Sequence, residues 1–255
     1  MMLQQTVDRL HELKLTGMAT ALEEQLRLPD AADLTFEDRL ALLIEREITA
    51  RHDRRLTRHL QLARLRLPAC VEDLDFRSPR GLDKSLILRL ASGDWVRNHQ
   101  VVLVTGATGT GKSYLACALG HSACRHGLST RYFRLSRLLG DLVIARGDGS
   151  YTRVLERLSR TGLLILDDFG LAPLKEHERR DLLEVIEDRH GRGATLVTSQ
   201  LPFEHWHEAV ADPTLADAIL DRLVHQAHRI SLKGPSMRAS KRNGNSTTRK
   251  EDQHS

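Results

Sequence analysis

Cysteine is scarce in this chain: three cysteines occur among 255 residues, and no two of them form a CxxC pair. This excludes the common zinc and dithiol motifs, because both bring two thiols together over a short turn. The chain also lacks any run of about 18 apolar residues, and no apolar signal stretch stands at its start. We therefore expect a reduced, cytoplasmic protein that makes no membrane contact.

A large excess of charge of one sign is missing as well. Lysine and arginine number 38 against 34 acidic residues, so net charge alone does not indicate nucleic-acid binding. The distribution is uneven, however, because the segment 51–66 is strongly basic and its one acidic residue is Asp53. A solvated helix face and a phosphate-binding surface explain this segment equally well. The candidate DNA contacts in it are Arg51, Arg54, Arg55 and Arg58.

Hydrophobic periodicity divides the chain into regions of different kinds. Residues 1–67 show helical spacing without strand signals, which predicts a small all-α domain that would bind DNA or a partner protein, or self-associate. Residues 68–99 predict a linker, with a short helix at 82–90 and with Trp95 packed onto the next domain. Residues 100–238 alternate strands with helices, which predicts an α/β domain whose parallel sheet is covered on both faces. Residues 239–255 have no apolar anchors and are predicted to be disordered.

Five strands are predicted in the α/β region. They cover residues 101–104, 130–135, 163–166, 194–199 and 228–232. One helix is predicted after the first strand and ends near residue 126. The other predicted helices cover residues 136–146, 151–160, 175–190 and 203–223.

The first predicted strand runs into a phosphate-binding pattern, GxxxxGK[ST]. Its residues are Gly106, Ala107, Thr108, Gly109, Thr110, Gly111, Lys112 and Ser113. The glycines let backbone N–H groups surround phosphates, the Lys112 ammonium reaches the terminal phosphates, and the Ser113 hydroxyl holds magnesium. A strand before the loop and a helix after it are the context that the motif requires. The loop and the adjoining Tyr114 therefore predict binding of ATP or GTP with Mg²⁺, and a plain glycine turn is the disfavoured alternative.

Two carboxylates follow the apolar strand 163–166. A buried strand would carry Asp167 to the carboxyl edge of the sheet beside the phosphate loop, where it can hold magnesium through water. Asp168 would face the terminal phosphate and orient the attacking water. Without the phosphate loop, a simple strand end would explain the pair.

Three further polar residues are candidates for the same site. Gln200 follows the strand 194–199 and could hydrogen-bond both the γ-phosphate and the attacking water. Arg222 and Arg238 could neutralise charge on a transferring phosphoryl group, from the same subunit or from a neighbour. A strand-end turn and surface solvation are the alternatives, and position alone does not choose between them.

The order of these motifs resembles the IstB-like ATP-binding proteins, which are encoded with transposases in bacterial insertion sequences. The shared segments are GDW at 93–95, GATGTGKSYLACALG, LLILDDFG, TSQLP with Trp206, AILDRLVHQAHRI and GPSMR. The resemblance covers residues 1–240 and is most specific between Trp95 and Arg238. The family belongs to the AAA+ ATPases and is close to DnaC-type helicase loaders. It implies a five-stranded parallel sheet in the order 5-1-4-3-2, flanked by helices and preceded by a small all-α domain.

The resemblance also implies roles for single residues. Lys112 and Ser113 match the Walker A lysine and hydroxyl, and Asp167 matches the Walker B aspartate. Asp168 stands where many AAA+ proteins have glutamate, and its shorter side chain implies slow or partner-stimulated hydrolysis.

The remaining roles concern neighbouring subunits and DNA. Gln200 matches the sensor-one position, and Arg238 matches the sensor-two arginine. Arg222 matches the arginine finger that acts on ATP bound to the adjacent subunit. The helices 136–160 match an insertion that approaches nucleic acid, with Arg137, Arg146 and Arg153 as the candidate phosphate contacts.

Together these roles imply an ATP-dependent helper of DNA transposition. Such a protein forms a homo-oligomer on duplex DNA with ATP at its subunit interfaces, and it recruits or stimulates the partner transposase. Hydrolysis would release the assembly. Two alternatives remain: a replicative helicase loader, whose N-terminal region would grip a helicase, and a small-molecule P-loop kinase, which would need an acceptor-binding lid.

Overall fold

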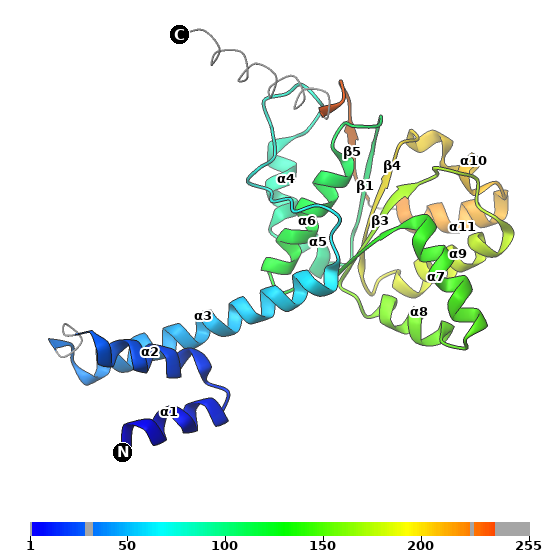
Figure 1. Ribbon diagram of the computed structural model, residues 1–255. Helices are drawn as coiled ribbons and strands as arrows, with labels where there is room; N and C mark the ends of the chain where they lie inside the picture. The colour runs from blue at the N-terminus through cyan, green and yellow to red at the C-terminus, as the bar shows by residue number, and fades with distance from the viewer. Residues whose placement is uncertain (1, 29–32, 225–226, 238–255) are drawn as a thin grey trace, which may run out of the picture. The chain divides into compact units, whose positions relative to one another are not determined.

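The computed structural model describes residues 2–28, 33–224 and 227–237, in two compact units that comprise Met1–Arg58 and His59–Ser255 (Figure 1). Arg238 and the segment 239–255 lie outside the described residues. Within the described part of the chain, no helix is long and apolar enough to cross a membrane. The functional boundaries near residues 67 and 99 stay predictions.

The N-terminal unit is helical, as its periodicity predicts. It contains α1 (Met2–Glu12), α2 (Thr16–Arg27) and most of α3 (Phe36–Ala63). The Glu47 carboxylate on α3 is 5% exposed, and it accepts the N–H groups of Gly17 and Met18 in the first turn of α2, at 2.7 and 3.2 Å. Gly17 permits this approach, since a Cβ there would lie 2.8 Å from the Arg46 carbonyl oxygen. A buried carboxylate therefore caps one helix from another.

Five parallel strands form the sheet of the second unit. They are β1 (Val101–Gly106), β2 (Thr130–Arg134), β3 (Leu163–Phe169), β4 (Ala194–Ser199) and β5 (His228–Leu232). Their order is β2-β3-β4-β1-β5, which confirms the predicted order read from the other edge.

Both faces of the sheet are covered by helices, which the unbroken apolar strands require (Figure 1). Val102 and Val104 of β1 pack in one hydrophobic cluster with α6 (Lys112–Arg125), α4 (Lys84–Ala91) and α5 (Asp94–Arg97). Leu103 points to the other cluster. That cluster is formed by α7 (Leu135–Gly147), α8 (Tyr151–Ser159), α9 (Glu176–Arg189), α10 (Trp206–Val210) and α11 (Pro213–Val224).

The predicted linker packs on the sheet domain rather than lying apart from it. Trp95 is 3% exposed and its indole N–H donates to the Leu90 carbonyl oxygen at 2.8 Å, which confirms its predicted packing role. The predicted helix 203–223 was wrong in one respect, because it is interrupted. Ala211 adopts a left-handed φ of 58°, which ends α10, and Pro213 then begins α11. Proline is tolerated at this position because the N–H groups of the first helical turn form no hydrogen bond within the helix.

Candidate nucleotide-binding site

Three adjacent strands deliver the candidate residues to one edge of the sheet. The phosphate loop follows β1, Asp167 ends the apolar part of β3, and Gln200 follows β4. Since β4 lies between β1 and β3, and parallel strands end at the same edge, the three segments meet there. The structure therefore brings together the loop, Asp167, Asp168 and Gln200.

The glycines of the phosphate loop are in conformations and contacts that other residues would not tolerate. Gly109 and Gly111 have φ values of 86° and 98°. A Cβ at Gly106 would lie 2.2 Å from the Leu232 carbonyl oxygen, and one at Gly109 would lie 2.1 Å from Ser236 Oγ. The loop ends at the N-terminus of α6, where backbone N–H groups favour an anion.

The Lys112 side chain lies inside the loop. It is 6% exposed, and its Nζ donates to the Ala107 carbonyl oxygen at 2.8 Å. At the tip of the loop, the Thr108 hydroxyl donates to Gln200 Oε1 at 2.7 Å. The loop and the predicted sensor residue are thus in direct contact. Tyr114 is half-buried beside the core, and burial raises the pKa of its hydroxyl.

Asp167 is the centre of a hydroxyl network. Its side chain is fully buried, and Ser113 Oγ lies 2.9 Å from each of its carboxylate oxygens. The hydroxyls of Tyr132 and Thr198 also donate to this carboxylate. Burial, and then the hydrogen bond to Asp167, raises the pKa of Tyr132, so its hydroxyl remains a donor.

This donor set fits magnesium, which prefers oxygen ligands and keeps several waters. Ser113 and Asp167 would hold the ion together with nucleotide phosphates. The described residues contain no cluster of three His, Cys, Asp or Glu side chains that could hold a metal by themselves.

Asp168 is held in a strained backbone conformation. Its φ is 66°, in the left-handed region, and its N–H donates to Thr198 Oγ1 at 3.2 Å. Two arginines that the sequence analysis did not assign to the site flank the carboxylates. Arg66 Nη1 lies 3.6 Å from Asp167 Oδ2 and 3.9 Å from Asp168 Oδ2, and Arg134 Nε lies 3.9 Å from Asp168 Oδ2.

A third arginine, Arg80, was also missed. It is 7% exposed and lies beside the phosphate loop, where its guanidinium donates to the carbonyl oxygens of Thr110 and Asp75 at 3.3 and 2.8 Å. A Cβ at Gly111 would lie 2.8 Å from this guanidinium. No linear motif marks Arg80, since two helices and a strand separate it from the loop along the chain.

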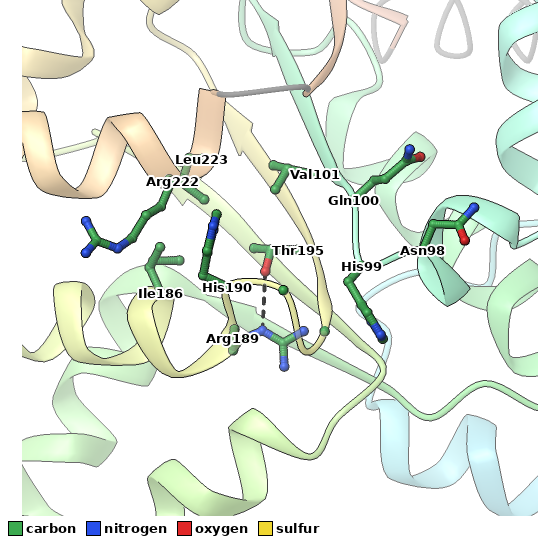
Figure 2. A pocket seen from close by; sticks show the side chains of 12 residues that line it. Asn98, His99, Gln100, Val101, Ile186, Arg189, His190, Thr195, Arg222 and Leu223 are labelled. Atoms are coloured by element: carbon green, nitrogen blue, oxygen red, sulfur yellow. Dashed lines mark hydrogen bonds between the residues drawn. The ribbon is translucent and has the colours of Figure 1, made fainter.

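Arg222 lies at the opposite edge of the sheet. It lines a cavity of about 320 Å³ with Val101 and Thr195, which stand at the beginnings of β1 and β4 (Figure 2). The six residues of β1 separate the two edges by about 20 Å at about 3.3 Å per residue. The Arg222 guanidinium donates to the Ala218 carbonyl oxygen at 2.7 Å and to Glu187 Oε1 at 2.6 Å. Arg222 is therefore not part of the phosphate site of its own subunit.

Arg238 lies outside the described residues, so its predicted role stays a prediction. The residue before it reaches the phosphate loop, because the Met237 N–H donates to the Gly109 carbonyl oxygen at 2.9 Å.

The candidate DNA contacts have different environments. Arg146 binds the fully buried Asp181 and lies over the Tyr151 ring at 3.7 Å, so its side chain already supports the packing of α7, α8 and α9. The side chains of Arg137 and Arg153 are exposed. In the N-terminal unit, Arg51, Arg54, Arg55 and Arg58 are all exposed, and Arg51 and Arg54 also bind Glu47 at 2.7 and 3.3 Å.

Comparisons with known proteins identify relatives of the whole chain. Residues 8–245 match the family model described as IstB-like ATP binding protein. The insertion sequence ATP-binding protein y4pL of Sinorhizobium fredii is 50% identical over 242 residues, which cover 95% of this chain and 99% of that protein. The ATP-binding protein of insertion sequence IS1162 from Pseudomonas fluorescens is 55% identical over 203 residues, covering 79% and 88%.

Solved structures with low sequence identity share the fold. DnaI superposes with a TM-score of 0.57 at 18% identity, over 65% of this chain and 92% of its own. AMPPCP-bound DnaA from Aquifex aeolicus superposes with a TM-score of 0.51 at 15% identity, over 68% and 57%. These likenesses confirm the AAA+ architecture.

Proposed function

Because this chain belongs to the family of IstB-like ATP-binding proteins, we propose that it is an ATP-dependent helper of DNA transposition. It forms a homo-oligomer on duplex DNA and recruits or stimulates its partner transposase. ATP bound between neighbouring subunits holds the oligomer together, and hydrolysis releases it. DNA and the transposase are proposed as partners because the relatives are named as proteins of insertion sequences.

One observation carries the proposal of a shared ATP site. Lys112 and Asp167 lie at the carboxyl edge of the sheet, whereas Arg222 lines a cavity at the amino edge of the same sheet. A rigid sheet cannot bring the two edges together, so a complete set of charges around the γ-phosphate requires a second subunit. An arginine supplied in this way stabilises charge that develops as the phosphoryl group leaves.

The chain's own residues divide the chemistry at the carboxyl edge. The loop N–H groups and Lys112 bind the phosphates, Ser113 and Asp167 hold magnesium, and Asp168 accepts a proton from the attacking water. Magnesium, when bound, supplies positive charge that offsets the charge of the phosphates. Gln200 hydrogen-bonds the γ-phosphate from the end of β4.

DNA binding is assigned to exposed arginines. Arg137 on α7 has a side chain that is 80% exposed, and Arg153 on α8 is exposed as well. Both are free of the buried ion pair that engages Arg146. Contacts of this kind bind the phosphate backbone, which gives weak sequence preference and strong salt dependence.

The experiment that tests the shared site compares Arg222→Ala with the wild type in the presence of duplex DNA. The variant is expected to bind ATP normally and to lose DNA-stimulated hydrolysis by at least about 100-fold, because an arginine finger contributes that much or more. Arg180→Ala is the matched control, since Arg180 on neighbouring α9 also pairs with a glutamate at 2.6 Å. Unchanged hydrolysis in Arg222→Ala would exclude the shared site.

A second measurement tests the assembly itself. Imaging of the purified protein on duplex DNA is expected to show oligomers with a nonhydrolysable ATP analogue and their loss without nucleotide. A protein that stays monomeric under every condition would contradict the proposal. Binding to a replicative helicase in place of a transposase would favour the helicase-loader alternative, for which the solved structures supply a shared fold alone.

A further inference from the structure

Arg66 occupies a position that the proposed chemistry does not use. It follows α3, and its side chain is 33% exposed, yet it lies within ion-pair distance of both acidic residues at the end of β3. In the described part of the chain, the ion pairs of Asp167 come from Arg66, whereas Arg134 pairs with Asp168. An arginine just after α3 thus contacts the carboxylate that would hold magnesium.

The contact is favourable for a clear physical reason. Asp167 is fully buried, and a buried carboxylate is costly unless it is hydrogen-bonded and paired with a positive charge. Three hydroxyls supply the hydrogen bonds, and Arg66 supplies the positive charge. Burial lowers the pKa of Arg66, but Tyr132 and the two carboxylates more than offset this, so its pKa is raised and it stays charged.

A divalent cation would compete for the same oxygen atoms. Asp167 Oδ2 already accepts from Tyr132 and lies 3.6 Å from Arg66. Magnesium beside Ser113 would bring two positive charges close to the guanidinium, in a region of low dielectric where like charges repel strongly. Both cations cannot be close neighbours of this carboxylate without a large electrostatic cost.

The segment that carries Arg66 is held by contacts on both sides of this residue. Arg64 has a left-handed φ of 51°, which ends α3, and Leu65 and Leu67 pack against the core beneath. Leu65 lies against α6, because a Cβ at Gly120 would be 3.0 Å from Leu65 Cδ2. The segment that carries Arg66 is therefore in contact with the helix that begins in the phosphate loop.

We propose that Arg66 takes the place of magnesium at Asp167 and Asp168 when no metal is bound, and that metal binding displaces it. This inference rests on the proposed magnesium site. Arg66 is a positioning residue: it keeps the carboxylates in place between rounds of nucleotide binding and weakens the binding of the metal. Its displacement removes one of the contacts that hold residues 64–67, which continue directly from α3, so this segment loosens when the metal binds.

The test measures metal affinity rather than activity. Mn²⁺, a spectroscopic substitute for magnesium, is titrated by electron paramagnetic resonance into the full chain saturated with ADP. Arg66→Gln is expected to bind Mn²⁺ about three- to tenfold more tightly than the wild type, as removal of a partly exposed competing charge requires. Arg64→Gln removes the same charge two residues away. Because the ion pairs of Asp167 and Asp168 in the described residues come from Arg66 and Arg134, this variant is expected to match the wild type.

A measurement on the wild type covers the case in which Arg66→Gln does not fold. Hydrogen exchange of the backbone amides of residues 64–67 is expected to increase with Mn²⁺ and ADP together, and to stay unchanged with ADP and a chelator. Mn²⁺ binding by Arg66→Gln that is equal to or weaker than that by Arg64→Gln would overturn the inference. Hydrogen exchange in the wild type that does not change when Mn²⁺ is added would overturn it as well. A wild type that binds no Mn²⁺ with ADP would instead overturn the magnesium site on which the inference rests.

Discussion

The two edges of the sheet are prepared for phosphates to different degrees. At the carboxyl edge, Ser113, Tyr132 and Thr198 already converge on the buried Asp167. At the amino edge, Arg222 is bound to Glu187 of its own subunit, and its side chain is 31% exposed. The first edge is organised to receive a nucleotide, whereas at the second edge Arg222 is occupied by an ion pair. Under the proposed function, a subunit would bind nucleotide alone, and its site would be completed by Arg222 of a neighbouring subunit.

The largest expected effect concerns the carboxyl edge. Lys112→Ala should weaken ATP binding by about 100-fold or more, because a buried ammonium that pairs with phosphates is lost. Isothermal titration of the full chain with ATP measures this directly. Lys175→Ala is the control, since Lys175 is an exposed lysine before α9. If Lys112→Ala still bound ATP normally, the nucleotide would bind elsewhere. The carboxyl edge would then be no better organised for nucleotide binding than the amino edge.

The next effect separates chemistry from binding at the same edge. Asp168→Asn should lower the rate constant of ATP hydrolysis by about 100-fold, since an amide cannot accept the proton of the attacking water. ATP affinity should change little, because Asp168 is assigned no phosphate contact. Single-turnover hydrolysis and equilibrium binding are measured on the same preparation. Equal losses in both would mean that Asp168 acts in nucleotide binding rather than as the base.

The sequence motifs predicted those site residues that lie together in one short, continuous segment of the chain. Lys112 and Ser113 belong to one continuous loop, and Asp167 ends an apolar run that can be recognised as a buried strand. The strands were predicted from short apolar runs, and the structure places successive residues of such a run, Val102, Leu103 and Val104, on alternate faces of the sheet. The order of the strands, by contrast, was implied by the family resemblance, because spacing along the chain does not specify which strands are adjacent.

The partners of these residues could not be predicted in the same way. Tyr132 and Thr198 reach Asp167 across 35 and 31 residues of chain, and Arg66 reaches it from before the first strand. No spacing rule connects residues on different strands until their register is known. Glu187 is one of several acidic residues of α9, and its ion pair with Arg222 depends on how α9 packs against α11.

The amino edge can be changed without touching the phosphate loop. Glu187→Gln should free Arg222 from its ion pair and lower the ATP concentration needed for assembly on duplex DNA by about three- to tenfold. Light scattering during an ATP titration at fixed DNA concentration measures the shift. Glu176→Gln, which breaks the similar pair with Arg180 on the same helix, should leave the midpoint unchanged. A higher midpoint in Glu187→Gln would show that Glu187 supports Arg222 in its active position rather than holding it back.

The smallest expected effect tests how far the carboxyl edge is organised in advance. Tyr132→Phe removes one hydroxyl donor from Asp167 while the ring stays in the core, where Tyr132 is 9% exposed. The buried carboxylate loses one of its hydrogen bonds, so the free energy of unfolding should fall by about 1 kcal/mol. Mn²⁺ affinity in the presence of ADP should change by about two- to fivefold, because Ser113 and Thr198 still orient the carboxylate. Chemical denaturation and the Mn²⁺ titration give the two values. Tyr151→Phe is the control, since it removes a hydroxyl donor from a different buried carboxylate, that of Asp181. If Tyr132→Phe weakened Mn²⁺ binding by about 100-fold, the effect would equal the loss of ATP affinity expected for Lys112→Ala. Tyr132, rather than the phosphate loop, would then contribute most to ligand binding at this edge.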